Sequence, residues 1–356
     1  MRFRVEKSGM LTTVQDLGRR GYQLQGVPVA GAMDACALRL GNLMLGNDEG
    51  AAALETTLLG PTLIVEEGSA CCVVTGADSP IKKNNVPVEP WRVFRLNKGD
   101  TLALSAPKNG VRSYLCFSGG IDVPLVMGSR STYTRGRFGG LEGRALKPGD
   151  CLTLGLPDPL WESSEGLECP SSLRPLRDPR TPLRVLLGPQ DDAFTPEGIE
   201  TFLTSEYVIS SSADRMGYRM EGPVIAHKAG PDIVSDAVVL GTVQVPGHGQ
   251  PIVMLADRQT TGGYTKLATV CTADIGVLAQ RLPGQTVRFA RISAVDAVKY
   301  LAEESRLCEE MRRLRAAWRV QGASSGGARA AQAQNSGALR VIVDGAAHNV
   351  TWERLE

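Results

Sequence analysis

The apolar residues of this chain fall in short runs rich in valine, leucine, isoleucine and threonine. Glycine, proline, asparagine and aspartate separate these runs, which include residues 61–65, 70–74, 101–104, 183–187 and 251–255. Short apolar runs closed by turn-forming residues are typical of β-strands, and a high density of them favours barrels or sandwiches. We therefore predict a mostly β fold.

Only a few helices are expected. Asp34 is suited to cap a helix over residues 35–45, and Thr195 followed by proline predicts another up to residue 205. A short helix is expected over residues 273–280. The longest is predicted over residues 293–318, where a capping box precedes an apolar stripe that should pack on the body or on a partner. The stripe consists of Val298, Leu301, Ser305, Cys308 and Met311.

Composition divides the chain into five parts. A stretch rich in proline and arginine, residues 170–182, marks the expected boundary between an N-terminal lobe, residues 1–178, and a C-terminal lobe, residues 179–292. The predicted helix over residues 293–318 follows the second lobe.

The last two parts differ from the rest in composition. Residues 319–338 are rich in glycine, serine, alanine and glutamine, which predicts a flexible linker. Residues 339–356 contain two β-like runs around Asp344 and Gly345, a pair that favours a hairpin turn. A lone hairpin is marginal in water, so this one should dock on a sheet edge or on a neighbouring subunit.

Charge is balanced, with 39 basic and 38 acidic residues. This balance argues against a general electrostatic attraction to nucleic acid or to an anionic membrane. No apolar run approaches the roughly 20 residues that a membrane span needs. Charged residues at the N-terminus stand where a signal peptide would be apolar. We therefore expect a cytoplasmic protein with neither a nucleic-acid nor a membrane partner.

Cysteine and histidine give little sign of a metal site. None of the eight cysteines forms a Cys-x-x-Cys pair, and most lie among apolar residues, as Cys116 does. We interpret them as small buried side chains rather than disulfides or zinc ligands. The three histidines are too far apart in sequence for a local metal motif. No metal site is expected.

Candidate chemistry is confined to three polar clusters, because the sequence lacks a phosphate loop, a dinucleotide-binding motif and a Gly-x-Ser-x-Gly elbow. The first cluster contains Gln15, Asp16, Arg19 and Asp34 among glycines. Glycine turns let the backbone approach a ligand, and Asp16 and Arg19 could bind opposite ends of it. Alternatively, these two residues form a structural ion pair that fixes a turn.

The second cluster is centred on Arg215, which lies two residues before Gly217. A guanidinium group offers a two-pronged donor to a carboxylate or a phosphate, so Arg215 is a candidate anion clamp. Here too the alternative is a structural ion pair. Sequence alone leaves the two interpretations open.

The third cluster is the richest in polar groups. An apolar strand runs into Asp257, Gln259, Thr260 and Thr261, and Gln244 is expected on a neighbouring strand. Burying so many polar groups is costly unless they bind one another or a ligand. Asp257 could orient a substrate N–H or act as a base, and the hydroxyls could hold an oxyanion or a phosphate.

The motifs of these clusters, in their order along the chain, resemble the family that includes the C subunit of 5-oxoprolinase, the KipI antagonist and the second subunit of allophanate hydrolase. They are also similar to the carboxyltransferase domain of urea carboxylase. The resemblance spans residues 5–292, and the segment 128–132 adds Arg130 to the candidate substrate-binding residues. Two positions depart from the family pattern: Ala30 replaces a common serine, and Thr265 replaces a common proline. The shared motifs are residues 15–19, 31–34, 119–121, 128–132, 188–191, 214–217, 244–246 and 257–264.

The resemblance implies two cyclophilin-like β-barrel lobes and a companion subunit of related fold. It also implies an ATP-dependent opening of the 5-oxoproline lactam to glutamate, with ATP as cosubstrate bound together with the companion. Such a reaction needs an anion clamp, groups for the phosphates and a polar residue that contacts the lactam N–H. We expect Asp257, Gln244 and Arg215 to be catalytic and the other named cluster residues to bind the small amide substrate.

Two other functions fit the same resemblance. One is a component of a urea carboxylase or allophanate hydrolase system. The chain has no Ala-Met-Lys-Met-like hairpin, and its C-terminal hairpin has no lysine, so covalently attached biotin is not expected. The other is a regulator that antagonises a kinase inhibitor without catalysis of its own.

Overall fold

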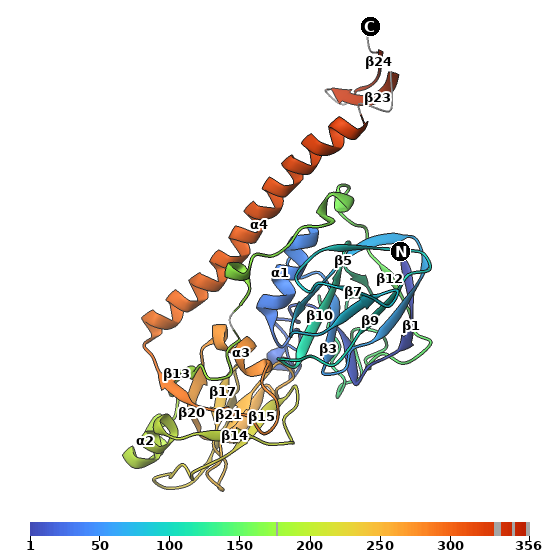
Figure 1. Ribbon diagram of the computed structural model, residues 1–356. Coiled ribbons are helices and arrows are strands. Elements are labelled where there is room, and N and C mark those ends of the chain that lie inside the picture. The colour runs from blue at the N-terminus through green and yellow to red at the C-terminus, as the bar shows by residue number, and fades with distance from the viewer. Residues whose placement is uncertain (176, 331–335, 344–345, 354–356) are drawn as a thin grey trace.

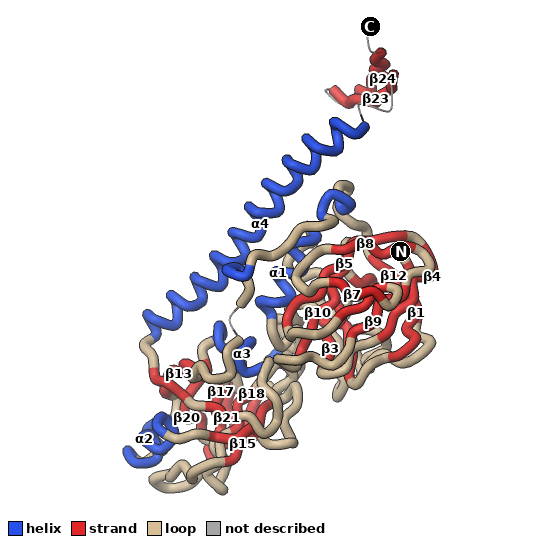
Figure 2. The backbone as a smooth tube through the Cα atoms, viewed as in Figure 1, coloured by secondary structure: helices blue, strands red, loops and turns tan. Residues whose placement is uncertain are grey.

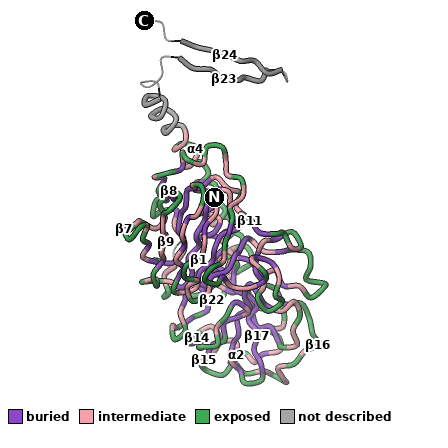
Figure 3. The backbone as a smooth tube through the Cα atoms, turned by 90° about the vertical axis from the view of Figure 1, so that its right-hand side faces the viewer, coloured by how far each residue is buried: buried purple, intermediate pink, exposed green. Residues whose placement is uncertain are grey.

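The structure is a computed structural model that describes residues 1–175, 177–330, 336–343 and 346–353, with side-chain surroundings described up to residue 319. Strands dominate two lobes, and one long helix runs along both (Figures 1 and 2). Buried positions concentrate on the strands of the two lobes, and exposed positions lie mainly on the peripheral loops (Figure 3). The predicted mostly β fold is confirmed.

The N-terminal lobe contains two sheets that pack face to face. Apolar side chains from both sheets form one core, in which the rings of Phe3 and Phe117 stack 5.2 Å apart. The larger sheet has the order β11-β12-β1-β4-β9-β6-β7 and the smaller β2-β3-β10-β5-β8. The larger consists of β1 (Arg2–Lys7), β4 (Thr62–Glu67), β6 (Ile81–Lys83), β7 (Val86–Val88), β9 (Thr101–Leu104), β11 (Ile121–Asp122) and β12 (Cys151–Leu154). The smaller consists of β2 (Leu11–Gln15), β3 (Ala53–Thr57), β5 (Ser69–Gly76), β8 (Phe94–Asn97) and β10 (Arg112–Phe117).

The smaller sheet is buried on both faces because helix α1 (Ala35–Leu45) covers the side away from the larger sheet. Successive side chains of a strand point to opposite faces, so a strand buried on both must be apolar throughout. The run 70–74 of β5 meets this requirement: Cys72 packs toward the larger sheet and Cys71 toward α1. All eight cysteines are free thiols; seven are buried as expected, and Cys151 is exposed.

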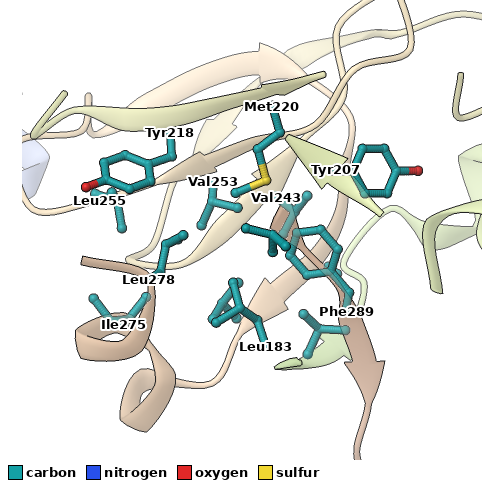
Figure 4. Close-up of a cluster of buried hydrophobic side chains, with 14 of the residues drawn as sticks. Leu183, Tyr207, Tyr218, Met220, Val243, Val253, Leu255, Ile275, Leu278 and Phe289 are labelled. Atoms are coloured by element: carbon teal, nitrogen blue, oxygen red, sulfur yellow. The ribbon is translucent and has the colours of Figure 1, made fainter. Parts of the chain in front are cut away.

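The C-terminal lobe is one eight-stranded sheet that nearly closes into a barrel. Its edge strands, β21 and β22, are separated by a single residue, so the chain itself brings the two edges of the sheet together. Aromatic and aliphatic side chains such as Phe289, Tyr207 and Val243 fill the interior (Figure 4). In spatial order the strands are β21 (Thr286–Val287), β14 (Tyr207–Ile209), β15 (Gly217–Glu221), β18 (Ile252–Met254), β17 (Thr242–Gln244), β20 (Lys266–Val270), β13 (Leu183–Leu187) and β22 (Phe289–Arg291).

Several smaller elements complete the two lobes. Helices α2 (Pro196–Thr204) and α3 (Thr272–Ala279) lie in the second lobe, near the positions predicted for them. A two-stranded ribbon, β16 (Asp232–Ala237) and β19 (Thr261–Tyr264), stands beside the barrel sheet. The short 3-10 helices are η1 (Gln23–Gln25), η2 (Trp161–Ser164), η3 (Ser171–Leu173) and η4 (Asp191–Ala193).

Helix α4 (Ala294–Ala330) is longer than predicted. Ser293 caps it as expected, since its hydroxyl oxygen accepts from the backbone N–H of Asp296 at 3.1 Å. The helix continues into the segment expected to be a flexible linker from residue 319. In residues 319–330 alanine, glutamine and arginine favour helix extension, whereas three glycines and two serines oppose it. Two of the five residues of the predicted stripe pack: Cys308 and Met311 are fully buried, whereas Val298 is 66% exposed.

The C-terminal segment expected to form a hairpin contains two antiparallel strands, β23 (Ser336–Val343) and β24 (Ala346–Glu353). The expected turn at residues 344–345 and the linker residues 331–335 lie outside the described part of the chain.

Candidate functional site

Arg215 and Asp257 form a two-pronged ion pair at adjacent strand ends. Arg215 precedes β15 and Asp257 follows β18, and these strands are antiparallel neighbours, so the two residues meet. Arg215 Nε donates to Asp257 Oδ2 at 3.0 Å, and Nη2 donates to Oδ1 at 2.9 Å. Both side chains are buried. The sequence named both residues as candidates but in two separate clusters, and it did not predict that they pair with each other.

Arg215 also joins the two lobes. Its Nη1 donates to Glu55 Oε1 on β3 of the first lobe, and its Nη2 donates to the carbonyl of Gly31 at 2.6 Å. Burial would lower the pKa of Arg215, but the charges of Asp257 and Glu55 outweigh it and raise the pKa. Because every guanidinium nitrogen is engaged by the protein, Arg215 matches the structural ion pair rather than the anion clamp, of the two interpretations that the sequence left open.

Glu55 was missed by sequence reasoning. Its Oε2 accepts from the Tyr114 hydroxyl at 2.8 Å and from the backbone N–H of Met33 at 2.9 Å. A single carboxylate within the otherwise uncharged strand 53–57 is a usable signal, since a buried charge needs a partner. That signal does not identify the partner, which comes from the other lobe.

Asp34 continues this network at the start of α1. It caps the helix as predicted, with Oδ1 accepting from Ala37 N at 3.2 Å, and it forms a fork with Arg177 at 3.0 and 2.7 Å. Gln280 Nε2 donates to Asp34 Oδ2 at 3.1 Å. Burial would raise the pKa of Asp34, but Arg177 and these hydrogen bonds prevail and lower it. The carboxylate is fully occupied, which leaves no oxygen free for the predicted substrate contact.

Asp16 fixes a loop rather than pairing with Arg19. Its Oδ1 accepts from Gly18 N at 2.7 Å and from the hydroxyls of Ser129 and Ser131, and its Oδ2 accepts from Arg130 N at 2.6 Å. Among the described residues no salt bridge joins Asp16 to Arg19. Of the two interpretations of this cluster, the structure supports a fixed turn, held by serine hydroxyls instead of by arginine.

Arg19 and Gln15 lie next to this loop, and each keeps one buried polar atom without a hydrogen-bond partner in the described structure. Arg19 Nη2 donates to the carbonyl of Ser131 and its guanidinium lies 4.9 Å from the Phe138 ring centre, while Nη1 has no partner. Burial lowers the pKa of Arg19 despite the nearby carboxylates of the site. Gln15 Nε2 donates to the Thr132 carbonyl at 3.2 Å, and its Oε1 has no partner.

Arg130 lies apart from the Asp257 cluster. Its Nε donates to the Val123 carbonyl at 2.9 Å, and it lines a separate cavity of about 580 Å³ together with five glycines and with Asp48, Asp122 and Asp158. The structure does not bring Arg130 together with Arg215 or Asp257.

Gln244 and Gln259 line a polar pocket of about 400 Å³, which the second lobe forms together with Arg135 of the first lobe. Gln259 Nε2 lies 3.4 Å from Gln244 Oε1, while the buried Gln244 Nε2 has no hydrogen-bond partner in the described structure. Thr261 is exposed on β19 and Thr260 is half-buried, and neither hydroxyl bonds to another described residue. The pair of amides is therefore the part of the third cluster that is arranged to bind a ligand.

Residues next to the first and third clusters, among them Arg20, Ala256 and Arg258, line a second cavity between the lobes, of about 450 Å³. The backbone N–H of Ala30 donates to the Ala256 carbonyl at 3.1 Å, which joins the two chain segments. Ala30 has a φ of 55°, so the backbone here adopts a conformation unusual for a residue with a side chain. Arg20 and Arg258 line this cavity together with α4.

The fold and these shared motifs agree with the comparisons. The chain belongs to the carboxyltransferase domain family, subdomain A and B, which matches residues 25–291. It is 39% identical to the C subunit of 5-oxoprolinase from Escherichia coli over 319 residues, which cover 89% of this chain and 98% of that protein. The Haemophilus influenzae protein of the same name is 38% identical over 302 residues, 85% of this chain and 95% of that protein.

A solved structure shows the same fold. The K. lactis urea amidolyase matches with a TM-score of 0.81 at 31% identity, covering 87% of this chain and 20% of that one. The resemblance to the urea-processing proteins that we inferred from the sequence motifs is therefore confirmed.

Two features are absent from the described part of the chain. No helix there has the length and apolar character required to span a membrane. Nor do three or more histidine, cysteine, aspartate or glutamate side chains gather there in a group able to hold a metal ion.

Proposed function

We propose that this chain is the C subunit of an ATP-dependent 5-oxoprolinase, which helps convert 5-oxo-L-proline to L-glutamate together with companion subunits. The observation that carries this proposal is the match to the C subunit of 5-oxoprolinase along nearly the full length of both chains. The length of the match supports the same role for the whole protein rather than for one shared domain.

The chemistry of lactam opening sets what such a complex must supply. An unstrained amide is a poor electrophile, and ATP supplies a phosphoryl group that activates the lactam oxygen for attack by water. The C–N bond then breaks and the nitrogen takes a proton, which leaves the phosphoryl group on the new carboxyl as an acyl phosphate. A second water hydrolyses this acyl phosphate, so one ATP and two waters give glutamate, ADP and phosphate. This chain has no phosphate loop, so we place ATP at a site formed with a companion subunit.

The residues of this chain divide into positioning and binding roles in the proposal. Asp257 and Arg215 hold the lobes in register, because their ion pair extends to Glu55 across the lobe boundary. Gln244 has a buried amide nitrogen without a partner in the described structure and could donate to a carbonyl of a bound ligand. These roles replace the direct catalytic roles of Asp257 and Arg215 that we expected from the sequence.

A urea-processing role is the second candidate, supported by the likeness to urea amidolyase. The experiment that separates the two is ATP hydrolysis by this chain mixed with its companion subunits, supplied with either 5-oxoproline or urea. Stimulation by 5-oxoproline alone supports the proposal. Stimulation by urea, or by neither compound with all subunits folded, would exclude it in favour of the urea-type or the regulatory role.

A further inference from the structure

The cavity between the lobes is lined by a buried cation, Arg258. Some buried arginines, such as Arg177 and Arg215, are forked onto carboxylates, whereas others, such as Arg281, bond to backbone carbonyls. Arg258 is only 8% exposed, yet it bonds to carbonyls alone: Nε donates to Val238 O at 3.1 Å and Nη1 to Leu255 O at 3.2 Å. Its Nη2 has no hydrogen-bond partner among the described residues, and the side chain lines the cavity.

A second cation faces the same space. The exposed Arg20 also lines the cavity and forms no salt bridge with another described residue. Burial, and then the like charge of Arg20, lower the pKa of Arg258 to about 10. Two guanidinium groups that face one cavity without a counter-ion repel each other, and a bound anion would remove that repulsion and complete the hydrogen bonds of Arg258.

The carboxylates on the cavity wall do not fill this role. Glu49 pairs with Arg39 at 2.5 Å, and Glu304 of α4 pairs with the same arginine at 3.6 Å. They make the Arg39 side of the cavity unfavourable for a ligand with several negative charges, such as a polyphosphate. The rest of the wall is mostly apolar, with small or aliphatic side chains that suit a compact ring, and also includes the polar residues Gln23, Thr272 and Ser305. Members of this apolar wall include Val29, Ala30, Leu240, Ala256 and Ile275.

We propose that this cavity between the lobes binds a small organic monocarboxylate, whose carboxylate is held by Arg258 and Arg20. This inference rests on the proposed function: the ligand is then 5-oxoproline itself. The site supplies the anion clamp, a role that Arg215 cannot perform because its guanidinium group is fully bonded. Arg258 is pre-oriented by two carbonyls from its own segment and from Val238, so a carboxylate gains a hydrogen bond without the need to reorder the side chain.

The test is to replace Arg258 by methionine, which removes the charge and keeps much of the volume. In the assembled complex, Arg258→Met is expected to raise the KM for 5-oxoproline about 10- to 100-fold, the range for loss of a hydrogen bond to a charged group. The KM for ATP should not change. Binding of 2-pyrrolidinone, which is the same lactam without the carboxylate, should be equal for the wild-type protein and the variant.

Arg281→Met is the matched control. Arg281 is equally buried and bonds to carbonyls of Thr286 and Thr181, but it does not line this cavity. If Arg258→Met does not fold, Arg20→Gln is tested in its place, because Arg20 is exposed. Arg20→Gln should also weaken the binding of 5-oxoproline. Three results would overturn the inference. Arg258→Met could raise the KM for ATP instead of that for 5-oxoproline, or it could have the same effect as Arg281→Met. The third is that 5-oxoproline binding is weakened by Gln244→Leu and by neither arginine variant.

A failure of this site is distinguishable from a failure of the proposed function. Binding of 5-oxoproline and of 2-pyrrolidinone to this chain can be measured calorimetrically without turnover. A carboxylate-dependent affinity that Arg258→Met abolishes supports the site even if the wild-type complex shows no 5-oxoproline-dependent ATP hydrolysis. Turnover that is normal in both Arg258→Met and Arg20→Gln contradicts the site and leaves the proposed function standing.

Discussion

The ion pair between Arg215 and Asp257 is expected to contribute to stability as well as to function. Removing one partner of a buried pair leaves the other charge without compensation, which typically costs about 3–5 kcal/mol. We therefore expect Asp257→Asn to lower the free energy of unfolding by about this amount, measured by urea denaturation. The network with Glu55 makes the loss larger than for an exposed pair.

Asp214→Asn is the control for this change. Asp214 lies on the same loop as Arg215, but its partner Arg135 is exposed, and such surface pairs contribute about 0–1 kcal/mol. The variant keeps the side-chain oxygen that accepts from Met216 N. Equal urea midpoints for Asp257→Asn and the wild-type protein would contradict a structural role for the pair.

Residue identities in the site were partly predictable. Asp34 was assigned correctly as a helix cap because capping depends on residues only three positions away. The meeting of Arg215 with Asp257 was not predicted, because the sequence placed these residues in two separate clusters. The ion pair between Glu55 and Arg215 was not predictable, since it depends on how the two lobes pack against each other.

At the scale of elements, the start of α1 should carry a measurable pH dependence. The pKa of Asp34 in the folded protein lies below its ordinary value of 3.8, so the unfolded chain takes up this proton first as the pH falls. The carboxylate therefore contributes stability above pH 3.8, and this contribution is lost as the pH falls through the lowered pKa.

Comparison of Asp34→Asn with the wild-type protein tests this dependence. The variant leaves Arg177 without its carboxylate, so it should be less stable by about 3–5 kcal/mol at neutral pH. Urea unfolding at a series of pH values should show the difference between the two proteins shrinking in acid. A difference that is constant from neutral to acid pH would show that the ion pair is not its origin.

Helix α4 should be anchored by the second half of its predicted stripe only. Met311 is fully buried in the core beside α1, so Met311→Ala should cost about 2–5 kcal/mol. Val298→Ala on the same helix is the control: its side chain is 66% exposed, and the change should stay within about 0.5 kcal/mol. Equal urea midpoints for the two variants would contradict the observed packing of α4.

The elements themselves were predictable where their cause is local. The strand runs and the starts of α1, α2 and α4 followed from alternation, proline and capping residues. The length of α4 was not predicted correctly. In our prediction, glycine and serine in residues 319–330 outweighed the helix-forming alanine, glutamine and arginine. The predicted packing of its stripe was right for Cys308 and Met311 only, because tertiary structure decides where the helix leaves the protein surface.

At the scale of the whole molecule, two lobes are joined by a polar network and enclose a cavity. Strand content predicted a barrel or a sandwich, and the protein contains a sandwich of two sheets and a nearly closed barrel. Strand order could not be read from the sequence, because pairs such as β13 with β22 join residues about a hundred positions apart. The cavity at the lobe boundary could not be predicted from the sequence either, since its walls come from distant segments of the chain.

The most direct test of the proposed function is the coupled release of ADP and glutamate by the reconstituted complex. With 5-oxoproline present, the two products should appear in equal amounts, and omission of this chain should abolish both. ADP release that is independent of 5-oxoproline, or glutamate formation that continues without this chain, would contradict its assignment as a required part of a 5-oxoprolinase.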